Sequence, residues 1–121
     1  MSQIRILYAD DDADLREVVR DQLTSMGYAL DEATNGGEAI EKLKDGNYTV
    51  LLLDINMPGL SGIDVLKFIK DNALKCKVIM LTGRVGFSVG TESIKLGADD
   101  YITKPFNVEY LLFSIKKVLS K

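Results

Sequence analysis

The residues of this 121-residue sequence that could do chemistry together are three aspartates, a threonine and a lysine. Each lies where an apolar run of strand length ends: Asp10, Asp11, Asp54, Thr82 and Lys104. If the runs are parallel strands, their carboxyl ends meet at one edge of a sheet, where open α/β sheets bind their ligands. The sequence therefore predicts a single site that combines these five side chains.

Carboxylates gathered at one site need a cation. Two such charges about 4 Å apart repel each other by about 4 kcal/mol at an effective dielectric of roughly 20. An all-oxygen site suits Mg²⁺ or Mn²⁺ better than zinc, and the sequence contains no histidine to bind a softer metal. We therefore predict a hard divalent ion, Mg²⁺ or Mn²⁺, at this site.

An aspartate beside such an ion can attack a phosphoryl group, because the resulting acyl phosphate is stabilised when cations and donors take up its charge. Asp54 is the predicted nucleophile, since a charged residue directly after Leu51–Leu53 has few structural reasons to be there. Lys104 supplies a positive group and Thr82 a hydroxyl donor. Phosphorylation would add roughly −1.5 to −2 charge at Asp54 and draw Thr82 and Lys104 inward.

Apolar runs of strand length alternate five times with stretches of helical period. The predicted strands are Ile4–Ala9, Ala29–Ala33, Val50–Leu53, Val78–Leu81 and Tyr101–Thr103. Acidic residues at positions 31 and 32 indicate an edge position for the second strand, whereas the aliphatic third strand suits the centre of the sheet. Since parallel strands need crossovers over the sheet, this order predicts a doubly wound α/β domain with helices on both faces.

The stretches between the strands carry helix start and stop signals. Starts are indicated by Asn35, Ser61 and Asn107, and stops by Gly27 and Gly97. The predicted inward face of the first helix consists of Leu15, Val18, Val19, Leu23 and Met26.

Composition bounds the class of protein. With 46% hydrophobic and 27% charged residues, the chain is predicted to be one soluble globular domain over residues 1–121. No apolar run approaches the roughly 18 residues of a membrane span, and the first residues lack the pattern of a signal peptide, so we expect a cytoplasmic protein without membrane insertion. Basic residues are scattered and the net charge is −3, which argues against direct nucleic-acid binding. A single cysteine, Cys76, excludes an internal disulfide.

Four motifs resemble those of receiver domains from bacterial two-component response regulators, including the single-domain chemotaxis type. They are Asp10-Asp11-Asp12, Asp54–Gly59 followed by Gly62, Leu81-Thr82-Gly83, and Leu96–Phe106. Together these motifs cover essentially the whole chain in order. The resemblance implies a flavodoxin-like (βα)5 fold, with a five-stranded parallel sheet in the strand order 2-1-3-4-5 and a cis Lys104–Pro105 bond.

The resemblance also implies a donor and a metal-ligand set. Asp54 would accept its phosphoryl group from a histidine kinase or a histidine phosphotransfer protein, which supplies the phosphohistidine that this chain lacks. Asp11, Asp54 and the backbone carbonyl of Asn56 would bind Mg²⁺ directly, and Asp10 would act through water. Thr82 would be one of the groups that hold the phosphoryl oxygens.

The implied output is protein binding. Lys104 would join Thr82 on the phosphoryl oxygens, and Tyr101 would turn inward on activation. These changes would alter the face formed by helix four, strand five and helix five, which a downstream protein target reads. Tyr110 and Phe113 exceed what the last helix needs for its buried stripe, so they are candidates either for that surface or for the edge of the core. Because the phosphoryl group stays on the chain, no turnover of an external substrate is expected.

Several alternatives stay open at this point. Asp12 could be a helix cap, and Tyr101 an ordinary packed strand residue. The chain could belong to a longer response regulator with a DNA-binding or enzymatic domain. A phosphatase of the haloacid-dehalogenase type would need an acid at Asn56, and an FMN-binding flavodoxin would need a Ser/Thr/Gly-rich loop where three aspartates stand. The segment Arg84–Gly90 departs from the usual receiver pattern, and a frayed helix start is predicted there.

Overall fold

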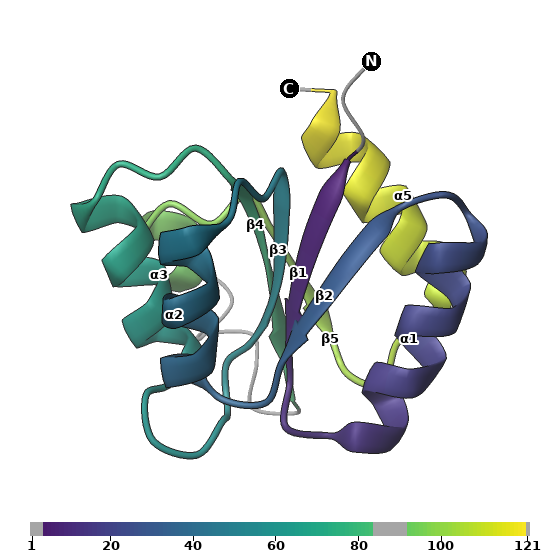
Figure 1. The fold of residues 1–121 in the computed structure, drawn as a ribbon, viewed down its shortest axis with the longest axis horizontal. Coiled ribbons are helices and arrows are strands. Elements are labelled where there is room, and N and C mark those ends of the chain that lie inside the picture. The colour runs from purple at the N-terminus through teal and green to yellow at the C-terminus, as the bar shows by residue number, and fades with distance from the viewer. Residues whose placement is uncertain (1–3, 84–91, 121) are drawn as a thin grey trace.

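The computed structural model describes residues 4–83 and 92–120 of the chain. Five parallel strands form one sheet in the order β2-β1-β3-β4-β5 (Figure 1). They are β1 (Arg5–Ala9), β2 (Ala29–Ala33), β3 (Val50–Asp54), β4 (Lys77–Thr82) and β5 (Asp100–Thr103). The predicted doubly wound order is confirmed, as are the edge position of β2 and the central position of β3.

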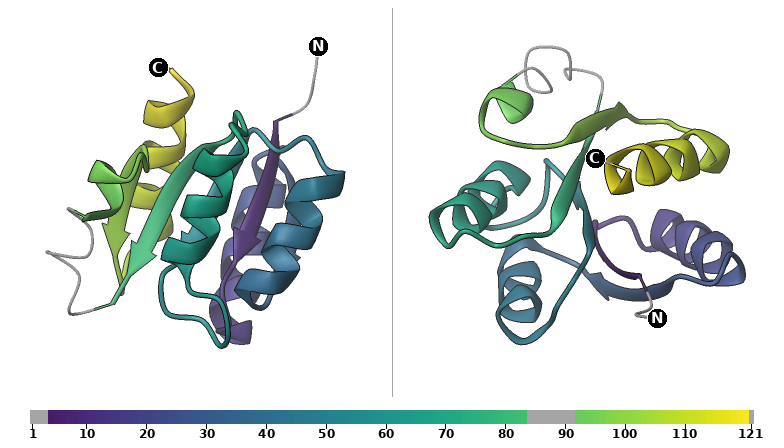
Figure 2. Two further views of the ribbon diagram at one scale, coloured as in Figure 1. Left: turned by 90° about the vertical axis from the view of Figure 1, so that its left-hand side faces the viewer. Right: turned by 90° about the horizontal axis from the view of Figure 1, so that it is seen from above.

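Helices cover both faces of the sheet. The helices α1 (Ala13–Ser25) and α5 (Val108–Leu119) lie on one face, and α2 (Gly36–Asp45) and α3 (Gly62–Asp71) on the other (Figures 1 and 2). Residues 92–95 are also helical and belong to the predicted fourth helix. The predicted start of that helix, including Arg84–Gly90, lies outside the described residues.

The predicted helix caps are present. Asn35 accepts a hydrogen bond from the backbone N–H of Glu38 at 2.8 Å, and Asn107 accepts one from Tyr110 at 2.7 Å. The Ser61 hydroxyl and the carboxylate three residues later form a capping box at the start of α3. Satisfying these first-turn N–H groups stabilises each helix by about 1 kcal/mol.

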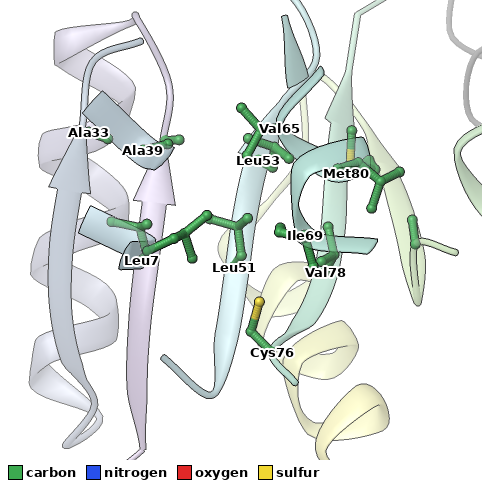
Figure 3. Close-up of a cluster of buried hydrophobic side chains, with 14 of the residues drawn as sticks. Leu7, Ala33, Ala39, Leu51, Leu53, Val65, Ile69, Cys76, Val78 and Met80 are labelled. Carbon is green, nitrogen blue, oxygen red and sulfur yellow. The ribbon is translucent and has the colours of Figure 1, made fainter. Parts of the chain in front are cut away.

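The sheet separates two hydrophobic cores, and β3 contributes to both. Successive side chains of a strand point to opposite faces. Leu51 and Leu53 therefore pack against α2 and α3, in the core shown in Figure 3, whereas Val50 and Leu52 pack against α1 and α5. All four side chains are fully buried, so the strand that ends at Asp54 is held from both sides.

The predicted inward face of α1 is wrong at two positions. Val19 and Leu23 are fully buried and Leu15 is partly buried, but Val18 is 51% and Met26 52% exposed. Helix α1 contacts β2, at the edge of the sheet, and α5. The row at i, i+4 and i+8 reaches the core there, and Val18 lies about 100° around the helix from the middle of that row. Met26 is the C-cap of α1 and follows its last helical residue. Within the described residues, no helix is long and apolar enough to cross a membrane.

Candidate functional site

The structure brings the predicted polar residues together at the carboxyl end of the sheet. Asp10 directly follows β1, Asp54 and Thr82 are the last residues of β3 and β4, and Lys104 directly follows β5. Backbone pairing sets their spacing, because the N–H of Ile55 donates to the carbonyl of Leu81 and that of Lys104 to the carbonyl of Thr82. The four strand ends therefore face one site.

Three carboxylates form the centre of this site. Asp10, Asp11 and Asp54 each offer one oxygen, and these oxygens lie within 4.8 Å of one another. Asp10 is fully buried and Asp54 is 4% exposed, whereas Asp11 is exposed to solvent. Such an all-oxygen set, closed on the protein side and open to water on the other, fits a hard divalent cation.

Lys104 bridges the two buried acids. Its Nζ lies 2.8 Å from Asp10 Oδ2 and 3.3 Å from Asp54 Oδ2, and its side chain is 22% exposed. Burial disfavours the charged ammonium, but the two carboxylates outweigh this and hold the pKa of Lys104 above its ordinary value. Among the described residues, the salt bridges of these two buried carboxyl groups both go to this one lysine.

The pKa values of Asp54 and Asp10 are shifted in opposite directions. Burial, and then the neighbouring Asp10, raise the pKa of Asp54 to about 7. Burial also opposes ionisation of Asp10, but hydrogen bonds from Lys104, from the Asp12 N–H and from Tyr8 outweigh it and hold the pKa of Asp10 below its ordinary value. The site therefore favours one buried negative charge, and a second needs another cation.

Two partners of Asp10 were not predicted. The hydroxyl of Tyr8 donates to Asp10 Oδ2 at 2.8 Å, and Arg16 Nη1 donates to the Asp10 backbone carbonyl at 2.7 Å. A signal for Tyr8 was available, because residues two apart on a strand share a face. Arg16 lies one helical turn after the Asp12 cap. The Nε of Arg16 donates to Glu32, near the end of β2, at 3.2 Å. This contact joins two different elements, so the spacing of residues in the sequence does not indicate it.

The remaining predicted residues lie around this centre. The Asn56 N–H donates to Asp54 Oδ1 at 3.2 Å, so the backbone after β3 turns toward the carboxylate. Thr82 is 1% exposed, and its hydroxyl donates to the Gly83 carbonyl at 3.1 Å. Tyr101 is partly buried and packs against the core on the α2/α3 face.

Local backbone features hold the site in place. A Cβ on Gly62 would lie 2.4 Å from the Asp54 carbonyl oxygen, so the loop after β3 can close only with glycine at this position. Asp12 caps α1 by accepting from the Leu15 N–H at 3.1 Å, which confirms the interpretation of Asp12 as a helix cap. The Lys104–Pro105 bond is cis, which confirms that prediction.

Comparison with known proteins identifies the family. A family model described as the response regulator receiver domain matches residues 6–116. The chain belongs to this family. The chemotaxis protein CheY of Bacillus subtilis is 37% identical over 117 residues, which cover 96% of this chain and 98% of CheY. The receiver interpretation is thus favoured over the haloacid-dehalogenase and flavodoxin alternatives.

Longer regulators are equally similar to this receiver domain. The transcriptional regulatory protein ResD of B. subtilis is 38% identical over 120 residues, which are 99% of this chain but 50% of ResD. The chain spans about half the length of the first transcriptional regulators that it matches. The assignment of residues 1–121 to a single domain stays a prediction.

A solved receiver structure adds chemical context. The response regulator TrrA from Thermotoga maritima, crystallised in complex with Mg²⁺-BeF, superimposes with a TM-score of 0.85 and 38% identity. The match covers 96% of this chain and 99% of that one.

Proposed function

We propose that this receiver domain is a Mg²⁺-dependent switch in which Asp54 accepts a phosphoryl group. The observation that carries the proposal is the pair of buried carboxylates, Asp10 and Asp54, that share the single ammonium of Lys104. Such an arrangement costs stability, since the second charge is uncompensated. The uncompensated negative charge has a function if a divalent cation binds there and Asp54 accepts a phosphoryl group.

The residues present fit Mg²⁺. Asp11, Asp54 and the backbone carbonyl of Asn56 would bind it directly, and Asp10 would act through a bound water. This set contains only oxygen ligands, and the chain has no histidine. The relative TrrA was solved in complex with Mg²⁺-BeF, which supports a Mg²⁺ site in this chain. When bound, the ion would neutralise charge between the carboxylates and an incoming phosphoryl group.

The reaction needs a phosphohistidine from a partner, a histidine kinase or a histidine phosphotransfer protein. A carboxylate oxygen of Asp54 attacks phosphorus, a P–O bond forms, and the P–N bond breaks with its electron pair left on the imidazole. The ammonium of Lys104 and the hydroxyl of Thr82 then take up charge on the phosphoryl oxygens. The product stays on the chain until water hydrolyses it, so the domain does not turn over an external substrate.

The output would be a changed protein-binding face. Movement of Thr82 and Lys104 toward the phosphoryl group would bias a two-state loop, and Tyr101 would turn inward. A groove of about 550 Å³ beside β5 is lined by Tyr101, Phe106 and Tyr110, among others. Tyr110 and Phe113 stack at 6.4 Å and are 50% and 60% exposed. Exposed aromatic side chains of this kind suit a protein target.

A second possibility is that the domain regulates an attached output domain. The half-length match to ResD and similar transcriptional regulators favours it. In that case the same face would contact a domain of the same polypeptide, and any DNA contact would come from outside this receiver.

The proposed chemistry is tested by intact-mass measurement after incubation with Mg²⁺ and acetyl phosphate or phosphoramidate. The wild type should gain one phosphoryl group only when Mg²⁺ is present, and Asp54→Asn should gain none. Asp45→Asn, which changes an exposed aspartate at the end of α2, is the matched control and should behave as the wild type. No gain in the wild type with either donor, or an equal gain in Asp54→Asn, would overturn the proposal.

A further inference from the structure

The hydroxyl of Tyr8 and the ammonium of Lys104 bind the same oxygen. Asp10 Oδ2 accepts from Tyr8 at 2.8 Å and has Lys104 Nζ at 2.8 Å, whereas Asp10 Oδ1 accepts from the Asp12 N–H at 3.0 Å. Each carboxylate oxygen has room for about two such partners. Oδ2 is therefore fully paired within the protein, and Oδ1 has capacity left for a water.

Tyr8 is held more firmly than Lys104. Its side chain is fully buried on β1, in the core between the sheet and the helices α1 and α5. The Lys104 side chain is 22% exposed and lies in the connection after β5. The phenol of Tyr8 is a hydrogen-bond donor, and its hydroxyl lies 2.8 Å from Asp10 Oδ2. Of the two donors on Oδ2, only the lysine can move without disturbing the core.

The proposed phosphorylation requires that movement. Lys104 has to turn from Asp10 Oδ2 toward a phosphoryl group on Asp54. A fully buried carboxylate that loses its ammonium partner is strongly penalised unless another donor remains. Without Tyr8, the departure of Lys104 would leave Oδ2 bare.

We propose that Tyr8 is a positioning residue: its hydroxyl keeps Asp10 Oδ2 hydrogen-bonded when Lys104 turns to the phosphoryl group, and so lowers the cost of the switch. This role rests on the proposed function of Asp54 and deepens it. It assigns to the receiver site a sixth side chain, from the core side of β1, that never touches the phosphoryl group.

The test is Tyr8→Phe, which removes the hydroxyl and keeps the ring in the core. Two dissociation constants are measured by calorimetry: that of Mg²⁺ alone, and that of beryllofluoride, a phosphoryl mimic, in saturating Mg²⁺. The hydrogen bond from Tyr8 to Asp10 should matter mainly after Lys104 has moved. Its loss should therefore weaken beryllofluoride binding about tenfold, the usual effect of one hydrogen bond to a charged group. Mg²⁺ binding alone should change by less than about twofold, since Lys104 and the Asp12 N–H still hold Asp10 in that state.

The control is Tyr28→Phe, because Tyr28 packs against the same core without being near Asp10 in the chain. It should leave both constants unchanged. An unchanged ratio of the two constants in Tyr8→Phe would overturn the role of Tyr8 while leaving phosphorylation at Asp54 intact. Equal weakening of both ligands, as a loosened core would cause, would overturn it too. Failure of the wild type to bind beryllofluoride would overturn both this role and the proposed function.

Discussion

Two aspartates at opposite ends of the sheet have the same kinds of partner but different neighbours. At the carboxyl end, Asp10 accepts from the Tyr8 hydroxyl and pairs with Lys104. At the amino end of β5, Asp100 accepts from the Ser114 hydroxyl at 2.6 Å and pairs with Lys117 at 3.0 Å. The two clusters differ because Asp10 has a second buried aspartate beside it.

The second aspartate changes the charge balance. In the Asp100 cluster, burial opposes ionisation, but the bonds from Ser114 and Lys117 outweigh it and the pKa of Asp100 lies below its ordinary value. One carboxylate there faces one ammonium, and the cluster ties α5 to β5. At the carboxyl end, Asp10 and Asp54 compete for Lys104, and the pKa of Asp54 rises to about 7. The same partners, a hydroxyl and an ammonium on one carboxylate, therefore stabilise the fold at Asp100. At Asp10, where a second buried carboxylate lies close, they leave a negative charge that a bound cation can neutralise.

The largest expected difference between the clusters is the effect of removing the lysine. In EDTA, Lys104→Met should lower the free energy of unfolding by about 3–5 kcal/mol, because it leaves buried carboxylates without their ammonium. Lys117→Met should cost less than about 1 kcal/mol, since Lys117 is 43% exposed and water can replace it. Urea unfolding of both variants at one pH measures this, and equal losses would break the comparison.

Magnesium should act on one cluster alone. At about one hundred times its dissociation constant, Mg²⁺ should raise the free energy of unfolding of the wild type by about 2.7 kcal/mol, because it binds the folded site. Asp100→Asn should gain the same amount, and Asp54→Asn should lose most of it. Thermal unfolding with and without EDTA gives the readout. A metal-induced gain that survives in Asp54→Asn would contradict the assignment of the ion to the carboxyl end.

Replacing each aspartate by asparagine should change metal-free stability in opposite directions. The raised pKa of Asp54 means that folding favours its protonated form, so the stability that it contributes at low pH is lost as pH rises through about 7. In EDTA, Asp54→Asn should therefore become more stable than the wild type by about 2 kcal/mol between about pH 5 and about pH 8.

Asp100 gives the matching control. The lowered pKa of Asp100 means that its contribution is present above its ordinary value and is lost as pH falls. Asp100→Asn should be about 1 kcal/mol less stable than the wild type near neutral pH, with the deficit shrinking in acid. Urea unfolding in EDTA from about pH 3 to about pH 8 measures both differences from the wild type: that of Asp54→Asn should grow between about pH 5 and about pH 8, and that of Asp100→Asn should shrink only below about pH 4. Differences that follow the same pH dependence would contradict the charge-balance explanation.

Local signals in the sequence were sufficient for most elements. The caps at Asn35, Ser61 and Asn107 act between residues three apart, so their spacing is visible in the chain. The same holds for the strand ends at Asp54 and Thr82, which follow aliphatic runs. Val18 was mispredicted because its exposure depends on how much of the sheet edge α1 covers, and Met26 because the helix ends one residue before it. Helical period alone cannot report that.

For the candidate site, residue types were predictable and hydrogen-bond partners were not. The sequence by itself determined the order of strands and helices and the gathering of acids, threonine and lysine at one edge, because periodicity and strand ends are local properties. Only the tertiary structure decided that Lys104 is shared by Asp10 and Asp54, and that Tyr8 supplies a second donor to Asp10 Oδ2. Those contacts, and the raised pKa of Asp54 that follows, depend on distances and burial across different strands, which spacing along one chain does not encode.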